Sequence, residues 1–156
     1  MRMRAIRMRA DGEGEATEAE LEAEGIRCGA FDPGAAALAL QRVVADRGWT
    51  EHEDVRRDGS KPRDEAESAR EADEHCHLGD EVRLFVEGQG CYDIRCTNDD
   101  WLRIWVGAGD LIAVPVRRYH RFMASKAGAI RYLQPYGGRH LLMQLYRVSD
   151  DRTRAM

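Results

Sequence analysis

The chain has 156 residues, 33% of them charged, and a formal net charge of -4. This length supports one domain with a buried core and hardly two. The two signs of charge are interspersed, which argues against a nucleic-acid binder, and no apolar run approaches the roughly 20 residues that a membrane span needs.

The N-terminal segment reads as a strand and not as a targeting signal. Residues 1–9 (MRMRAIRMR) alternate apolar and basic side chains, as a half-exposed strand does. They lack the apolar stretch and the cleavage site of a signal peptide, so the sequence predicts a cytoplasmic protein. Residues 11–16 (DGEGEA) are interpreted as a flexible acidic loop. The four cysteines form no CxxC pair, and in a reducing cytosol we expect free thiols.

Helix signals dominate the segment that follows. Thr17 and Glu20 fit a capping box, which predicts a short helix over residues 17–25. Residues 34–48 predict a second, alanine-rich helix that ends at its last glycine. Residues 60–71 are polar throughout, and we interpret them as a solvated helix or a loop that offers no chemistry.

After residue 74 the pattern changes to the alternation that is typical of strands. Short runs are separated by GQG, TNDD and GAGD turns. The predicted strands cover residues 81–88, 91–96, 101–107, 110–115 and 130–134. Regular short strands of this kind favour an antiparallel sandwich or barrel. We therefore predict one mainly β (α+β) domain over 1–156, divided into a helix-containing N-terminal part (1–73), a β core (74–136) and a C-terminal tail (137–156).

The stretch EHCHLGDEVRLFVEG carries the first candidate site. His75, His77, Glu81 and Arg83 all have odd numbers, so they can face one side of a continuous strand. If that side is the barrel interior, burying such polar groups without partners would cost roughly 2–7 kcal/mol each. A metal ion would remove that cost by using their lone pairs. The alternative is a polar surface hairpin that binds nothing.

A third histidine follows in the stretch GDLIAVPVRRYHRF. His120 comes shortly after a predicted strand that ends at Pro115. It is therefore a plausible further ligand that reaches the same site from a neighbouring strand.

These motifs resemble a known family. HxHxxxE followed by six residues and Gly88 is similar to the first cupin motif, and Gly109, Pro115 and His120 are similar to the second. The stretches HCHLGDEVRLFVEGQGCYDIR, DDWLRIWVGAGDLIAVP and YHRF resemble the acireductone dioxygenase family of methionine salvage. The resemblance is dense over residues 74–122. It implies a cupin-type double-stranded β-helix barrel with a helical N-terminal decoration.

The resemblance also implies a metal site and a reaction. Its ligand set would be His75, His77, Glu81 and His120, which suits one Fe(II) or Ni(II) per monomer. Two open positions would let an enediol substrate chelate through adjacent oxygens. With Fe(II) the family cleaves the acireductone 1,2-dihydroxy-3-keto-5-methylthiopentene with dioxygen to a 2-keto acid and formate. With Ni(II) it gives carbon monoxide, formate and a carboxylic acid.

Three further residues would contact the substrate. Arg83 and Arg131 match arginines of the family and could hold negative oxygens, although each could instead form an ordinary salt bridge on a strand. Phe122 shares the parity of His120 and could form a wall around the substrate tail or simply pack in the core. We expect a small-molecule enediol and dioxygen as the only partners, with no nucleic acid, no membrane and a monomeric chain.

The chain departs from the family after the second motif. Val116, Arg117 and Arg118 stand where a small residue and a glycine are usual, and the segment after Leu133 differs from the family's ending. These changes leave the substrate tail open. The alternatives are a relative that acts on another enediol or β-keto compound, and a non-enzymatic cupin that binds a small molecule. A zinc protein is disfavoured because no cysteines have ligand spacing.

Overall fold

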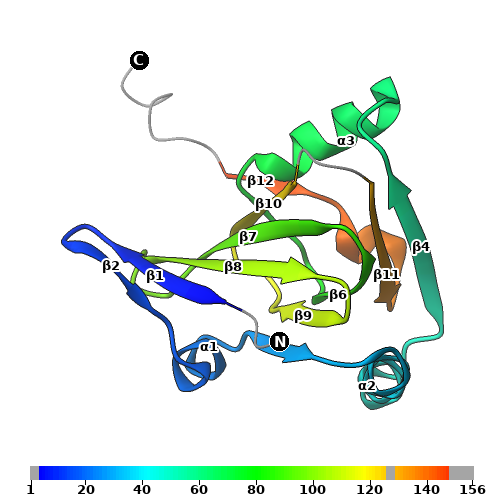
Figure 1. The fold of residues 1–156 in the computed structure, drawn as a ribbon, viewed down its shortest axis with the longest axis horizontal. Helices are drawn as coiled ribbons and strands as arrows, with labels where there is room; N and C mark the ends of the chain where they lie inside the picture. Colours follow the sequence, from blue (N-terminus) through cyan, green and yellow to red (C-terminus); the bar gives the residue numbers. More distant parts are fainter. Residues whose placement is uncertain (1–3, 126–128, 148–156) are drawn as a thin grey trace.

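Two antiparallel sheets face each other and form a barrel in the computed structural model, which describes residues 4–125 and 129–147 (Figure 1). The strands of the larger sheet are, in order, β12 (Leu145–Tyr146), β5 (His75–Cys76), β10 (His120–Ala124), β7 (Gln89–Arg95), β8 (Trp101–Gly107), β1 (Ala5–Arg9) and β2 (Gly12–Glu15). Those of the smaller sheet are β3 (Arg27–Ala30), β9 (Asp110–Val114), β6 (Glu81–Glu87), β11 (Ile130–Tyr136) and β4 (Glu51–Arg57). The predicted mainly β barrel is confirmed.

The core lies between the two sheets because the strands alternate as predicted. In β8 the buried positions are every second residue, beginning with Leu102 and Ile104. These side chains meet Phe85, Ile112 and Tyr132 of the smaller sheet in one apolar cluster. Burial of this apolar surface supplies the main driving force for closing the barrel.

The helices begin and end at residues with identifiable capping roles. They are α1 (Glu18–Ala23), α2 (Pro33–Arg47), α3 (Pro62–Ala72) and a 3₁₀ turn, η1 (Arg139–Leu142). The predicted capping box of α1 is present, since Thr17 and Glu20 each accept the other's backbone N–H. Gly48 ends α2 with φ 65°, a left-handed conformation that glycine adopts without strain. Among the described residues, no helix is long and apolar enough to cross a membrane.

The N-terminal part is more than a decoration of the barrel. Residues 11–16 were predicted to be a loop, but residues 12–15 form β2 and pair with β1 as a hairpin. β1 in turn pairs with β8, while β3 and β4 are the edge strands of the smaller sheet. Helix α2 packs on the outer face of that sheet through a second apolar cluster (Figure 1). Residues before position 74 therefore contribute strands to both sheets.

Candidate metal centre

Three histidines converge at one end of the barrel. His75 and His120 are direct partners across the antiparallel strands β5 and β10, and their ring centroids lie 4.6 Å apart. The ring of His77 lies 5.0 Å from that of His75 and 5.3 Å from that of His120. All three side chains are buried, and one potential ligand nitrogen from each lies within 4.8 Å of the others.

The route of the chain to this site differs from the continuous strand that was predicted. β5 ends at Cys76 in the larger sheet, and after a bend the chain enters the smaller sheet as β6, beginning at Glu81. His75, His77, Glu81 and Arg83 are nevertheless all buried. They meet because the chain crosses from one sheet to the other, and not because they share one strand face.

Each imidazole is oriented by a backbone carbonyl. Nδ1 lies 2.6 Å from the carbonyl oxygen of Asp73 in His75, 3.0 Å from that of Met143 in His77, and 2.8 Å from that of Arg118 in His120. A carbonyl can only accept, so Nδ1 carries the proton and the Nε2 lone pair remains for another partner. Hydrogen bonds of this kind are the usual outer support of metal-binding histidines.

The carboxylate of Glu81 faces these nitrogens. Its oxygens lie 3.2 Å from Nε2 of His77 and 3.5 Å from Nε2 of His120. Both Nε2 atoms are buried and make no hydrogen bond to any described residue. Lone pairs of nitrogen and oxygen therefore face one another at close range, an arrangement that a cation between them stabilises. This donor set of three imidazoles and one carboxylate fits a divalent transition metal.

The pKa shifts of His75 and Glu81 agree with a cation-binding site. Burial, together with the neighbouring His120, lowers the pKa of His75 to about 4, so this imidazole is neutral near pH 7. Burial alone would raise the pKa of Glu81, but the positive charge of Arg83 holds that pKa well below its usual range. Burial would lower the pKa of His77, yet the nearby Glu81 carboxylate raises it, so a metal has to compete with a proton for this nitrogen. The carboxylate thus stays ionised and attracts positive charge.

A buried polar network continues from Glu81 into the barrel wall. Arg83 Nη2 lies 3.1 Å from Glu81 and donates to Glu71 over 2.8 Å, while its Nε donates to Gln134. Glu71 also receives both terminal nitrogens of Arg57. Burial disfavours the Glu71 carboxylate, but Arg83 and Arg57 together lower its pKa. The network is ionic, and the attraction of its alternating charges offsets much of the cost of burying them.

This network lines a cavity of about 740 Å³ that reaches His77 and Glu81. Its walls come from β4, α3, β11 and η1, and include Arg57, Glu71, Tyr132, Gln134 and Leu142. A cavity that reaches Glu81 and the unpartnered Nε2 of His77 can admit a small molecule to a bound metal.

The three predicted substrate residues lie in different environments. Arg83 lines the cavity. Phe122 is buried in the core and packs on Tyr92, with the Arg83 guanidinium 5.4 Å from its ring. The structure does not bring Arg131 to the site, because its guanidinium forms a bidentate ion pair with Asp54 on the partly exposed face of β11.

Neither of the two arginines that depart from the family lines the cavity. Arg118 pairs with Glu24 at 2.6 Å. Arg117 has φ 57°, a left-handed conformation that is uncommon for a residue with a side chain, and its N–H donates to the carbonyl of His77. Here the backbone of Arg117 supports a candidate ligand, and neither side chain lines the cavity.

Several residues of the site carried no signal in the sequence. Glu71 ends a segment that was predicted to be solvated, and that prediction is wrong for the last turn of α3 because Glu71 is buried. Arg57 and Gln134 sit on strands of mixed pattern. Met143 contributes only its backbone oxygen to His77, and no side-chain motif reports such a contact.

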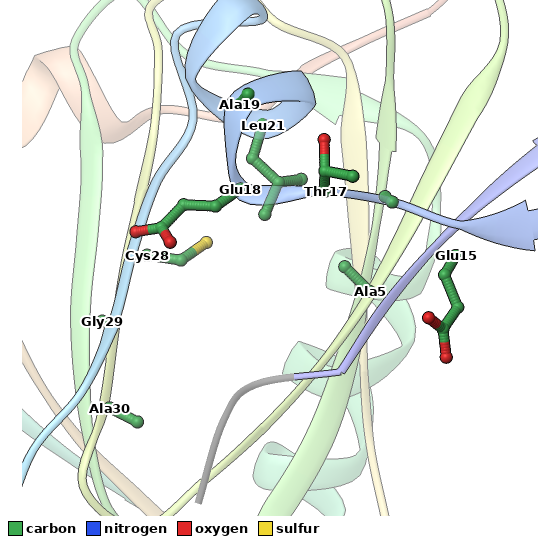
Figure 2. Close-up of a pocket in the computed structure, with 10 residues that line it drawn as sticks. Ala5, Glu15, Thr17, Glu18, Ala19, Leu21, Cys28, Gly29 and Ala30 are labelled. Carbon is green, nitrogen blue, oxygen red and sulfur yellow. The ribbon is translucent and has the colours of Figure 1, made fainter.

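A second cavity, of about 750 Å³, lies between β1, α1 and β3 (Figure 2). Its lining includes Ala5, Leu21 and the thiol of Cys28, which points into the cavity. Burial raises the pKa of this thiol to about 12, so it is protonated at neutral pH and is no nucleophile. All four cysteines are free thiols. We therefore place the candidate site at the histidines.

Relatives of the chain can be recognised by sequence. It is 35% identical over 91 residues to an acireductone dioxygenase of Heterostelium pallidum. The matched segment covers 58% of this chain and 62% of that protein. It is 32% identical over 114 residues to an acireductone dioxygenase of Ixodes scapularis, covering 72% and 62%. The matched segments thus span less than two thirds of these relatives.

The fold also has a counterpart among solved structures. An acireductone dioxygenase from Bacillus anthracis, described with a cadmium ion in its active center, superimposes with a TM-score of 0.78 at 22% identity. The superposition covers 94% of this chain and 99% of that one. At this identity the likeness establishes the cupin fold alone. The profile of the ARD/ARD′ family matches residues 9–137, most of the chain, and the protein therefore belongs to that family.

Proposed function

We propose that this protein is a mononuclear metal-dependent dioxygenase that cleaves an acireductone-type enediol with dioxygen to a 2-keto acid and formate, as in methionine salvage. The observation that carries the proposal is the set of buried imidazole nitrogens that face Glu81 without hydrogen-bond partners. Family membership and the names of the relatives support the same activity.

His75, His77, Glu81 and His120 would hold the metal, one Fe(II) or Ni(II) per chain. A bound metal would supply Lewis acidity and a template for two adjacent substrate oxygens. The backbone carbonyls of Asp73, Met143 and Arg118 fix each imidazole with Nε2 free. Tyr92 donates to Glu81 Oε2 over 3.0 Å and orients the carboxylate.

Arg83 has two tasks in this proposal. Its charge keeps Glu81 ionised and therefore able to bind a cation. Its position on the cavity wall also lets it stabilise the negative charge of an enediolate, because a guanidinium interacts well with adjacent oxygens. Phe122, beneath the guanidinium, helps to keep water from this end of the barrel. Arg131 has no role in the proposal. Cytoplasmic location, the monomeric state and the single-domain boundaries stay predictions.

The test measures metal and reaction in sequence. Protein purified without added metal is analysed for bound iron and nickel, reconstituted with Fe(II), and mixed aerobically with a synthetic acireductone. Oxygen uptake and stoichiometric formate are expected. A metal-loaded protein that consumes no oxygen above the uncatalysed rate would contradict the dioxygenase and favour a binding-only cupin.

A further inference from the structure

One nitrogen of Arg83 has no partner although the side chain is almost completely buried. Arg83 is 3% exposed and lines the candidate cavity. Its Nε donates to Gln134 over 2.8 Å, and its Nη2 lies 2.8 Å from Glu71 and 3.1 Å from Glu81. Nη1 is buried and makes no hydrogen bond to any described residue. Buried donors are rarely left unpaired in folded proteins, so this nitrogen calls for a partner that the described chain does not supply.

The contacts of the other two nitrogens set the place of Nη1. A guanidinium is planar and rigid, so Nη1 is fixed once Nε and Nη2 are fixed. The Tyr132 ring supports this plane, with its centroid 4.2 Å from Cζ of Arg83. Gln134 holds Nε, whereas Glu71 and Glu81 share Nη2. Because Glu81 is a candidate metal ligand, Glu71 is the carboxylate that can be devoted to Arg83.

Glu71 is itself held firmly at this position. It is 3% exposed, in the last turn of α3, and its two oxygens receive the two terminal nitrogens of Arg57. Arg57 is fixed in turn, because it also donates to the hydroxyl of Tyr132 over 2.7 Å. Among the described residues, the Glu71 carboxylate accepts hydrogen bonds only from Arg57 and Arg83. The carboxylate thus connects the two arginines and gives Arg83 an acceptor with a fixed position.

Stability alone does not account for a carboxylate at position 71. Replacing a buried ion pair by well-packed apolar residues of similar volume is often neutral or stabilising. Apolar side chains could therefore fill this part of the wall at little cost in free energy of unfolding. They could not accept a hydrogen bond from Arg83. The property that Glu71 adds to the wall is therefore an acceptor for Nη2.

We infer that Glu71 is a positioning residue for substrate binding, which holds the Arg83 guanidinium so that Nη1 can donate to a negatively charged oxygen of the enediolate. This inference rests on the proposed function and assigns a role to a residue that acts through Arg83. An enediolate is already charged when it binds, so the contact stabilises the bound substrate as well as the later states. Its loss should therefore raise KM and change kcat little.

Two double variants isolate the hydrogen bond from the charge. Arg57→Met is combined with either Glu71→Gln or Glu71→Leu, so both proteins lack one charge of each sign and neither leaves Arg57 unpaired. The glutamine can turn its amide oxygen toward Arg83, as Gln134 does, whereas the leucine offers no acceptor. The two proteins therefore differ in the support of Arg83 and not in net charge.

The kinetic test uses both proteins with saturating Fe(II) and an acireductone. The leucine variant should have a KM about tenfold to a hundredfold above the native value, and the glutamine variant should stay within about threefold. The kcat of both should change by less than about twofold. Damage to the fold would lower the active fraction, and hence kcat, without moving KM. Equal KM values in the two double variants would overturn the inference.

Asp93→Asn is the matched control. Like Glu71, Asp93 is a buried carboxylate that receives two arginines, Arg103 and Arg121, but it does not line the candidate cavity. This variant should lower the free energy of unfolding and keep the native KM. A rise in KM as large as that of the leucine variant would indicate a general response to a lost ion pair and would refute the positioning role.

A binding measurement tests the inference without turnover. Calorimetry under argon measures the Kd of Fe(II)-loaded protein for 4-methylthio-2-oxobutanoate, the anionic 2-keto acid that the proposed reaction would release. The leucine variant should bind this acid about tenfold or more weakly than the native protein and the glutamine variant do. Absence of oxygen uptake with an acireductone would refute the proposed function. Equal Kd values for the two double variants, or no binding to the native protein, would refute the role of Glu71 whether or not oxygen is consumed.

Discussion

Two cavities among the described residues have nearly the same volume, about 740 Å³ next to His77 and Glu81 and about 750 Å³ beside Cys28. Their volumes do not distinguish them, but the residues that line them do. The first reaches Glu81 and the unpartnered Nε2 of His77, whereas the second is lined largely by small or apolar side chains and a protonated thiol. Buried polar atoms without partners therefore distinguish the candidate site better than cavity volume does.

Loss of a histidine should have the largest effect. His75→Ala, His77→Ala and His120→Ala should each lower metal content sharply and reduce turnover below detection, because every variant removes a nitrogen from the donor set. His52→Ala is the matched control, since His52 is exposed on β4. Elemental analysis and oxygen uptake measure the outcome. Full metal occupancy in all three variants would erase the distinction between the cavities.

Metal removal should also weaken the fold at the histidine end. A metal that binds only the folded state adds RT ln(1 + [L]/Kd) to the free energy of unfolding, roughly 2.7 kcal/mol at a free concentration of 100 Kd. Chelation should therefore lower the melting temperature of the native protein. It should leave the melting temperature of His75→Ala unchanged. An equal fall in the melting temperatures of the two proteins would show that the chelator does not act through a metal at the histidines.

The ionic wall provides the next test. Glu71→Leu leaves Arg57 buried beside Arg83 without its carboxylate and should cost about 3–5 kcal/mol of unfolding free energy. The double variant Arg57→Met with Glu71→Leu removes one charge of each sign, so it should recover most of that loss. Denaturant unfolding at equal metal loading measures both. Equal losses in the single and double variants would contradict an ionic wall held by pairing.

A buried carboxylate that lines neither of these two cavities should affect stability alone. Asp93 is fully buried and receives Arg103 and Arg121. Burial alone would raise its pKa, but these hydrogen bonds lower it. Its contribution is therefore present above the unfolded pKa, about 4, and is lost as pH falls through the lower folded value. Asp93→Asn should cost about 1.5–3 kcal/mol of unfolding free energy at pH 7. It should also reduce the loss of stability that the native protein shows as the pH falls below about 4.

The two ends of the barrel were not equally predictable from sequence. Period-two alternation located the core strands, and the HxHxxxE spacing with His120 located the histidines. Glu71 could not be found in this way, because a glutamate in a polar helix reads as solvated unless its partners are known. Those partners, Arg57 and Arg83, come from strands far away along the chain. Pairing between distant strands leaves no local pattern.

Backbone contributions were equally invisible. The carbonyl of Met143 orients His77, although the C-terminal tail was predicted only to diverge. The break between β5 and β6 was missed because the odd numbering of the ligands fits one strand as well as it fits a crossing between two sheets. Parity grouped four residues that do lie near one another, but for a reason that the structure corrects.

Changes at Cys28, in the cavity beside α1, should have the smallest effect. Burial raises the pKa of its thiol to about 12, so at pH 7 almost none of the protein carries the thiolate that an alkylating reagent needs. Alkylation of Cys28 in the folded protein should therefore be very slow and should accelerate as pH rises.

Cys28→Ala should leave kcat/KM unchanged and cost about 1 kcal/mol of unfolding free energy or less, because the cavity already beside it limits the packing that is lost. Mass spectrometry after iodoacetamide treatment and denaturant unfolding measure these two quantities. A Cys28→Ala variant with impaired turnover would show that the cavity beside α1 communicates with the histidine end, and the division of the barrel into a reactive and an inert end would fall.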